Sequence, residues 1–242
     1  MPKVLRTSEK ILFVLNFFGD FLEDERNPLG LFSSSYRSVF SFTPNKKTRN
    51  HFQQALSRLC GGGLVERKRR AEQTFLRLTS AGHNKLIHSF PNLSRRPARA
   101  WDGYWRLVSF DVSEPYRKIR NLLREILKDF GFALFQESLY LCPFDLDREL
   151  KSYLNGTKLD RFVRIFKALK TGEDKEIAER LWNLDEINGK YQKVLRDFEI
   201  NGNKALLRER FLEVASSDPN LPLDLLPDDW VGSYVEKKAL SG

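Results

Sequence analysis

Two groups of residues in this chain of 242 amino acids could act on a nucleic acid, one by catalysis and the other by binding. The first centres on the carboxylate of Asp111, which ends the strand-like run WRLVSFD before a turn and an amphipathic segment. A carboxylate at a strand end can hold Mg²⁺, which activates a water for attack on a phosphodiester. The alternative is structural: Asp111 ends the strand, and Ser113 caps a helix that starts at Pro115.

Catalysis through Mg²⁺ would require more ligands than the sequence places around Asp111. The ion prefers octahedral oxygen coordination, whereas this stretch offers only Glu114 and the hydroxyl of Ser113. The three histidines of the chain lie far from this stretch and do not have the spacing of metal ligands. We therefore expect no catalytic residue, no metal and no cofactor. Asp111 would be the metal ligand, with Mg²⁺ as the cofactor, only if the protein were a nuclease.

The second group lies in SFTPNKKTRNHFQQALSRLCGGG, which is predicted to form a helix. Thr43-Pro44 is a suitable helix start, the glycines from Gly61 end the helix, and Phe52, Leu56 and Leu59 form an apolar stripe. The remaining face has four cations and no acidic residue. It consists of Asn45, Lys46, Lys47, Arg49, Asn50, Gln53, Gln54, Ser57 and Arg58.

This polar face has the residue types that bind double-stranded DNA. Cations pair with phosphates, and amide side chains can make bidentate contacts to adenine edges. The alternative is an ordinary solvated face, but such faces usually mix glutamate with lysine for i,i+4 support. The following stretch, LVERKRRAEQTFLRLT, is predicted to be two short strands around a basic turn that adds phosphate contacts. The predicted DNA-binding residues are Lys46, Lys47, Arg49, Asn50, Gln53, Gln54, Arg58, Arg67, Lys68, Arg69 and Arg70.

The positive charge of the chain is confined to its N-terminal part. Residues 1–100 contain 18 lysines and arginines against 7 aspartates and glutamates, so all of the net charge of +9 lies there. This asymmetry indicates a module that binds a polyanion. No apolar run is long enough to span a membrane, and the N-terminus is predicted to be a first core helix rather than a secretory signal. Two cysteines outside any CxxC pattern suit a reducing cytoplasm, where we expect the protein to act.

The elements that position these residues predict an α+β fold with three parts and a linker. Three helices, at residues 8–22, 31–40 and from residue 45, precede two strands and a helix capped by Thr79, which is the order of a winged helix-turn-helix. The middle segment has the order βαββαβ, which predicts a ferredoxin-like sheet with both helices on one face. The boundaries are 1–90 for the winged helix-turn-helix domain, 91–102 for the linker, 103–170 for the ferredoxin-like domain and 171–242 for a mostly helical C-terminal domain.

Four stretches of the chain resemble the PaaX family of bacterial transcriptional repressors: WDGYWRLVSFDVSE, WNLDEINGKYQKVLRDF, DPNLPLDLLPDDWVG and ALSRLCGGGLVERKR. The resemblance implies a winged-helix domain, a central domain like the small nuclease of CRISPR adaptation, and a helical C-terminal domain. It also implies a homodimer that binds operator DNA and is released by an aryl acyl-coenzyme A thioester. The central domain would then be the dimerisation domain.

These residues favour a sequence-specific regulator of transcription that binds double-stranded DNA, with a repressor as the preferred form. Two alternatives remain open at this point. The chain could be a metal-dependent nuclease of the CRISPR-adaptation type, or the structural adaptor of a CRISPR integrase, with an added winged helix. It could also be a basic architectural protein without site preference.

Overall fold

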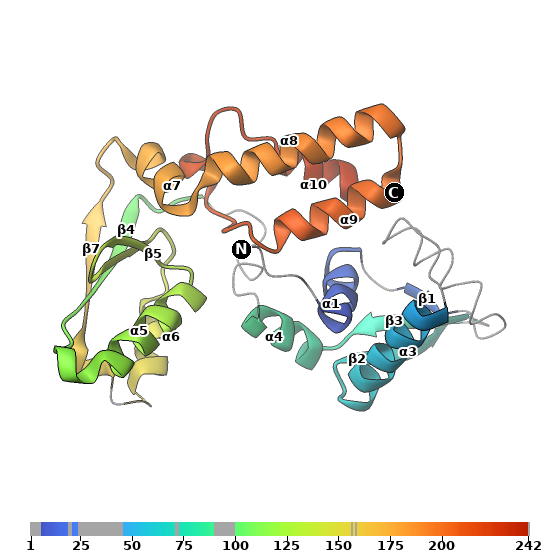
Figure 1. The fold of residues 1–242 in the computed structure, drawn as a ribbon, viewed down its shortest axis with the longest axis horizontal. Helices are drawn as coiled ribbons and strands as arrows, with labels where there is room; N and C mark the ends of the chain where they lie inside the picture. The colour runs from blue at the N-terminus through green and yellow to red at the C-terminus, as the bar shows by residue number, and fades with distance from the viewer. Residues whose placement is uncertain are drawn as a thin grey trace. The chain divides into compact units, whose positions relative to one another are not determined.

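The computed structural model describes residues 6–18, 21–23, 46–70, 73–89, 100–155, 157 and 159–241. Helices and antiparallel sheets alternate along these residues, so the predicted α+β class is confirmed (Figure 1). The chain forms two compact units: unit 1 contains residues 1–89, 187–218 and 230–242, and unit 2 contains residues 90–186 and 219–229. The helix predicted at 31–40 and residues 91–99 of the predicted linker lie outside the described residues.

The N-terminal part of unit 1 combines three described helices with a three-stranded antiparallel sheet of order β1-β3-β2. Buried residues Ile11–Leu15 of the first helix pack in a core with Leu56 of the second and Leu86 of the third. The predicted DNA-binding helix and the two strands after it are confirmed as elements. These elements are α1 (Thr7–Phe18), β1 (Phe21–Glu23), α3 (Lys46–Gly61), β2 (Val65–Arg70), β3 (Gln73–Leu78) and α4 (Ser80–Ser89).

The first helix is shorter than its apolar spacing predicted. Phe21 and Leu22 were expected to continue it, but they lie in β1, where they pair with Leu76 and Phe75 of β3. Apolar residues at these positions suit either element, and backbone pairing with β3 decides in favour of the strand.

Thr79 fixes the start of α4 against the turn that follows α3. Its hydroxyl accepts a hydrogen bond from the backbone N–H of Gly82 at 3.0 Å, which confirms the predicted N-cap. The same hydroxyl donates to the carbonyl of Gly63 at 2.7 Å. Gly82 is required here because a Cβ atom would lie 2.0 Å from the carbonyl oxygen of Leu64. The exit of α3 and the entry of α4 are therefore held together.

The C-terminal part of unit 1 is helical, as predicted. Residues that follow its second helix pack back against its first helix, α8 (Leu184–Asn201). The hydroxyl of Tyr191 donates to the buried carboxylate of Asp218 at 2.8 Å, and the Trp230 ring packs edge-on against Tyr191. The backbone N–H of Val231 donates to the Asn188 side chain. The helices of this part are α8 (Leu184–Asn201), whose first residues belong to unit 2, α9 (Lys204–Ala215) and α10 (Gly232–Leu240), which the sequence did not predict.

Unit 2 contains a four-stranded sheet of order β5-β6-β4-β7 in which all neighbouring strands are antiparallel. Its elements follow the predicted order. One core cluster joins Val108 and Phe110 of the sheet to Leu127 of α5 and Leu150 of α6, so both helices cover the same face (Figure 1). The elements are β4 (Tyr104–Phe110), α5 (Arg117–Asp129), β5 (Ala133–Gln136), β6 (Leu139–Cys142), α6 (Asp147–Asn155), β7 (Val163–Leu169) and α7 (Asp174–Trp182).

The WDGYWR stretch at the start of β4 forms a buried polar junction. The guanidinium of Arg106, whose side chain is 1% exposed, makes two hydrogen bonds to Asp102, at 2.6 and 2.7 Å, and an ion pair with Asp145 at 3.1 Å. The hydrogen bond from Arg106 keeps the pKa of Asp102 below its ordinary value of 3.8. The Trp105 ring stacks on Trp182, and its indole N–H donates to Asp174 at 2.7 Å. The contacts of Trp105 tie the start of β4 to α7.

Asp174 makes the stability of unit 2 depend on pH. Burial by itself raises the pKa of Asp174, but hydrogen bonds from the Trp105 indole N–H and from the backbone N–H groups of Gly172 and Thr171 outweigh it. The pKa therefore falls below 3.8. A carboxyl with a lowered folded-state pKa stabilises the fold above its unfolded-state pKa, and this stabilisation is lost as the pH falls through the folded-state value.

We therefore expect Asp174→Asn to lower the melting temperature at neutral pH, by a margin that shrinks as the pH falls to about 3. Thermal unfolding across this range measures the margin. Asp129→Asn, at an exposed position on α5, is the control and should show no such trend. A difference in melting temperature between the wild type and Asp174→Asn that stays constant with pH would contradict a lowered pKa of Asp174.

Among the described residues, no helix is both long enough and apolar enough to cross a membrane.

Candidate nucleic-acid interface

The predicted division of α3 into a buried and an exposed face is confirmed. Ala55, Leu56 and Leu59 are at most 5% exposed and lie on the side that packs against α1. The residues of the predicted polar face whose side chains are described all lie in solvent. They are Asn50, Gln53, Gln54, Ser57 and Arg58.

The exposed amides of α3 form one continuous face. Asn50, Gln53, Gln54 and Ser57 follow the i, i+3, i+4, i+7 spacing that places side chains on one side of a helix. The Nε atom of Arg58 donates to the carbonyl of Gln54 at 3.2 Å, so the guanidinium lies along the same helix. No residue from Lys46 to Gly61 is acidic. This arrangement offers donors and acceptors for base edges next to a cation for a phosphate.

Three of the predicted contact residues, Lys46, Lys47 and Arg49, occupy the first turn of α3, but their side chains lie outside the described part of the structure. Asn45, just before the helix, is also outside it. The described interface therefore begins at Asn50.

The basic run Arg67–Arg70 was predicted to be a turn, but it forms the last four of the six residues of strand β2. Arg67, Lys68, Arg69 and Arg70 pair in register with β3, and the last of these pairs is Arg70 with Gln73. The ladder extends this far because both strands continue to pair, so the connection contains only two residues. Successive side chains of a strand point to opposite faces, so the cations are not gathered at a tip.

The cations of β2 have two possible physical roles. Arg67, Lys68 and Arg69 are exposed, so their side chains are accessible for the phosphate contacts that the sequence predicts. The side chain of Arg70 lies outside the described residues. Among the described strands, β2 is at the edge of its sheet, and charged residues on an edge also prevent pairing with another chain.

Glycines join α3 directly to β2. Gly63 has a φ of +68°, a left-handed conformation that ends the helix, and the Leu64 N–H donates to the Leu59 carbonyl at 2.9 Å. A short turn with this hydrogen bond therefore connects α3 to the basic strand β2. The sequence reasoning missed Gly82, which holds α4 against this connection; a glycine three residues after a capping threonine was the available signal.

Among the described residues, the surroundings of Asp111 contain no cluster of metal-ligating side chains. Its side chain is exposed, and its backbone N–H donates to the carbonyl of Phe162 at 3.2 Å, which ties the end of β4 to the start of β7. The other candidate carboxylate, Glu114, forms an ion pair with Arg120 at 2.6 Å. In the part of the chain that the structure describes, no three His, Cys, Asp or Glu residues are grouped closely enough to hold a metal ion.

The predicted cap by Ser113 is wrong in its details. Ser113 precedes a single 3₁₀ turn, Glu114–Tyr116, and its side chain makes no capping hydrogen bond. Its carbonyl instead accepts from the Tyr116 N–H at 2.9 Å, and α5 begins only at Arg117. Pro115 favours the tight turn because its backbone needs no hydrogen-bond acceptor.

We expect plasmid DNA incubated with the full chain and Mg²⁺ or Mn²⁺ to remain intact, and Asp111→Ala to behave as the wild type does. A lone exposed carboxylate leaves most of the coordination of Mg²⁺ to water. Gel analysis of plasmid topology measures the cutting, and the full chain allows two copies to pair their carboxylates. Cutting that disappears in Asp111→Ala would contradict this assignment and establish a nuclease.

Comparisons with known proteins agree with the resemblance seen in the sequence. Residues 98–178 match the family model described as the PaaX protein central Cas2-like domain. The transcriptional repressor PaaX of Escherichia coli strain K12 is 26% identical over 212 residues, an alignment that covers 77% of this chain. It covers 66% of the repressor, so this chain spans just under two thirds of the relative's length.

A solved structure, the uncharacterized protein Rv0674 from Mycobacterium tuberculosis, is similar with a TM-score of 0.55. The match covers 78% of each chain at 22% sequence identity. Similarity at this level of identity concerns the fold alone.

Proposed function

We propose that the chain is a sequence-specific DNA-binding regulator of transcription, most simply a repressor, because its residues 98–178 match the model of the PaaX central Cas2-like domain and most of the chain is similar to a PaaX repressor. The observation that carries the proposal is the exposed, acid-free face of α3. Cations position a protein on the phosphate backbone, and amides on a helix read bases in the major groove.

In this proposal the N-terminal elements form a winged helix-turn-helix. Helix α3 is the recognition helix, because it is the last helix before the β2–β3 hairpin and exposes its polar face. The hairpin is the wing, and the exposed cations of β2 contact phosphates along its length. DNA in the cytoplasm is the partner, and the protein needs no bound cofactor for this function.

We further propose that unit 2 is a ferredoxin-like domain through which two copies of the chain pair. The strand order β5-β6-β4-β7 with both helices on one face supports this arrangement. On the other face, Phe166 of β7 is 54% exposed and pairs in register with Leu107 of β4. An exposed aromatic ring on an apolar sheet face is a suitable contact for a second copy. A homodimer would present two copies of α3 to two half-sites.

The repressor is expected to release its operator when it binds a small effector. A thioester of the acyl-coenzyme A type is the candidate effector that the family resemblance implies.

Selection of bound duplexes from a random pool tests the proposed function. We expect an enriched site with two related halves, as a symmetric dimer requires. If each protomer contacts about three to five phosphates, the logarithm of the affinity should fall with the logarithm of the salt concentration with a slope of about −5 to −9. A slope near zero, or no enrichment over the starting pool, would contradict the proposal.

A further inference from the structure

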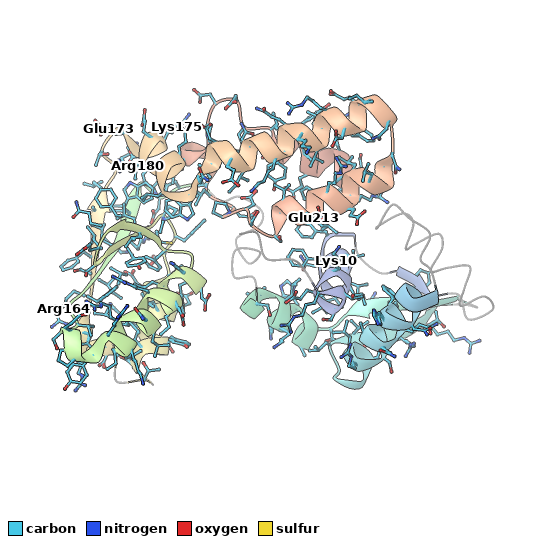
Figure 2. The ribbon with its side chains drawn as sticks, viewed as in Figure 1. Lys10, Arg164, Glu173, Lys175, Arg180 and Glu213 are labelled. Atoms are coloured by element: carbon cyan, nitrogen blue, oxygen red, sulfur yellow. The ribbon has the colours of Figure 1, made fainter. Side chains whose placement is uncertain are left out.

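Unit 1 contains a groove of about 370 Å³ between α8 and α9. It is open to solvent on one side, and its volume lies at the lower end of the range found for small-molecule sites. Figure 2 shows one of its lining residues, Glu213, on α9. The lining consists of Lys190, Lys193 and Val194 of α8 and of Arg210, Glu213, Val214 and Ser217 of α9.

The walls of this groove are positively charged. Three of the seven lining residues are cations and only Glu213 is acidic. Lys193 is exposed, so its ammonium group can reach an anion at the mouth of the groove. Arg210 forms an ion pair with Asp197, which fixes the guanidinium at the wall. The formal charges of the seven lining residues sum to +2, from three cations and one acid.

The floor of the groove is apolar. Val194 is 5% exposed and Val214 is 7% exposed, so their methyl groups form a closed surface between the charged walls. A ligand that matches both features has an apolar body and an anionic group. We propose that the groove binds a small organic anion, a carboxylate or sulfonate on an aromatic or aliphatic body.

Packed side chains connect the groove to the helix that is proposed to read DNA. Phe211 lies one turn before Val214 on α9, and its ring contacts Phe17 of α1 edge-on, with 5.5 Å between the centroids. Tyr191, next to Lys190 on α8, also lies against Phe211, at 6.4 Å. Helix α1 packs in turn against α3. A ligand that changes the distance between α8 and α9 would therefore shift α1, and with it the surface against which α3 packs.

The regulatory part of the inference rests on the proposed function. A ligand in the groove changes the affinity for DNA by the coupling free energy between the two sites, and typical couplings change affinity about 5- to 150-fold. The binding part stands without DNA and can be tested on the full chain alone.

The binding test compares two fluorescent probes on the full-length protein. 1-Anilinonaphthalene-8-sulfonate carries a sulfonate, and N-phenyl-1-naphthylamine has the same aromatic body without it. We expect the sulfonate to bind more tightly to the wild type. Lys193→Glu should weaken sulfonate binding about tenfold, because an attraction is replaced by a repulsion at short range. Glu213→Gln should strengthen it.

Lys237→Glu is the matched control, because it makes the same charge change at an exposed position on α10 of the same unit, away from the groove. It should leave sulfonate binding unchanged. Equal effects of Lys193→Glu and Lys237→Glu, or equal binding of the charged and uncharged probes, would overturn the proposed site.

The regulation test adds the probe to the complex with a selected duplex. We expect the affinity for the duplex to change at least about fivefold in the wild type and to stay constant in Lys193→Glu. An unchanged affinity in the wild type, with the probe bound, would overturn the regulatory part and leave the site in place. Weaker DNA binding by Lys193→Glu without any probe would show that the groove cations contact DNA, which overturns the small-molecule assignment.

If no duplex is bound at all, the proposed function fails, and the regulatory part fails with it. The two-probe comparison still decides whether the groove is an anion site, so the two failures are distinguishable.

Discussion

Replacement of both Asn50 and Gln53 by alanine is expected to lower the affinity for the selected duplex at least about thirtyfold, since each bidentate contact from an amide to a base contributes about 1–3 kcal/mol. Both side chains are exposed on the same face of α3, so their removal costs no packing. Alanine also has the higher helix propensity, so α3 itself should not be weakened. The thermal unfolding of the variant should match that of the wild type.

Fluorescence anisotropy at one fixed salt concentration measures this loss, with the selected duplex and a random duplex side by side. Binding to the random duplex should change little, because phosphate contacts supply most of it. Asn121→Ala combined with Gln136→Ala is the matched control, since both amides are exposed in unit 2. An unchanged affinity of the α3 variant for the selected duplex would place recognition elsewhere on the protein.

The second large effect is expected from Gly82→Ala, which should destabilise the fold by about 3 kcal/mol or more through overpacking. The new Cβ atom would lie 2.0 Å from the carbonyl oxygen of Leu64 and 2.7 Å from a methyl carbon of Leu78. The backbone of Leu64 directly follows the turn that ends α3, so it cannot yield as a flexible side chain would. Helix α4 must move away, and the hydrogen bonds of Thr79 to this turn are lost. DNA binding should fall together with stability.

Gly189→Ala on α8 makes the same chemical change as Gly82→Ala, but it is expected to stabilise the fold. Apart from the neighbouring residues and backbone of its own helix, no atom lies within 4 Å of a Cβ built at Gly189. Alanine should therefore stabilise the protein by about 0.5–1 kcal/mol. Urea unfolding of both variants measures the difference. A Gly82→Ala protein as stable as the wild type would show that α4 does not press against the exit of α3.

The parts of the interface that follow from local spacing were predictable. The stripe of Leu56 and Leu59 requires only the period of a helix, so the buried side of α3 follows from sequence, and the exposed amides follow with it. The strand conformation of Arg67–Arg70 could not be predicted in this way. It depends on how many residues of β2 pair with β3, and local spacing does not determine that number. The same holds for Phe21, whose partner lies more than fifty residues further along the chain.

Contacts between distant segments were beyond sequence reasoning. Three acids of the stretch DPNLPLDLLPDDWVG contact residues that lie far away in the sequence. Asp218 accepts from Tyr191 in unit 1, whereas Asp224 accepts from the Trp101 N–H and Asp228 pairs with Lys175 in unit 2. The charged groove between α8 and α9 was missed for the same reason, since its cations meet only when the two helices pack.

Photo-cross-linking from α3 is the measurement that tests the central claim most directly, because it reports which atoms of the protein touch the bases. A photoreactive benzoylphenylalanine replaces Gln54 on the exposed face of α3 or, as the control, Asn121 on α5. We predict that irradiation links position 54 to bases inside the selected site and leaves position 121 unlinked. Cross-links from position 121 but none from position 54 would show that this face of α3 does not lie against the double strand.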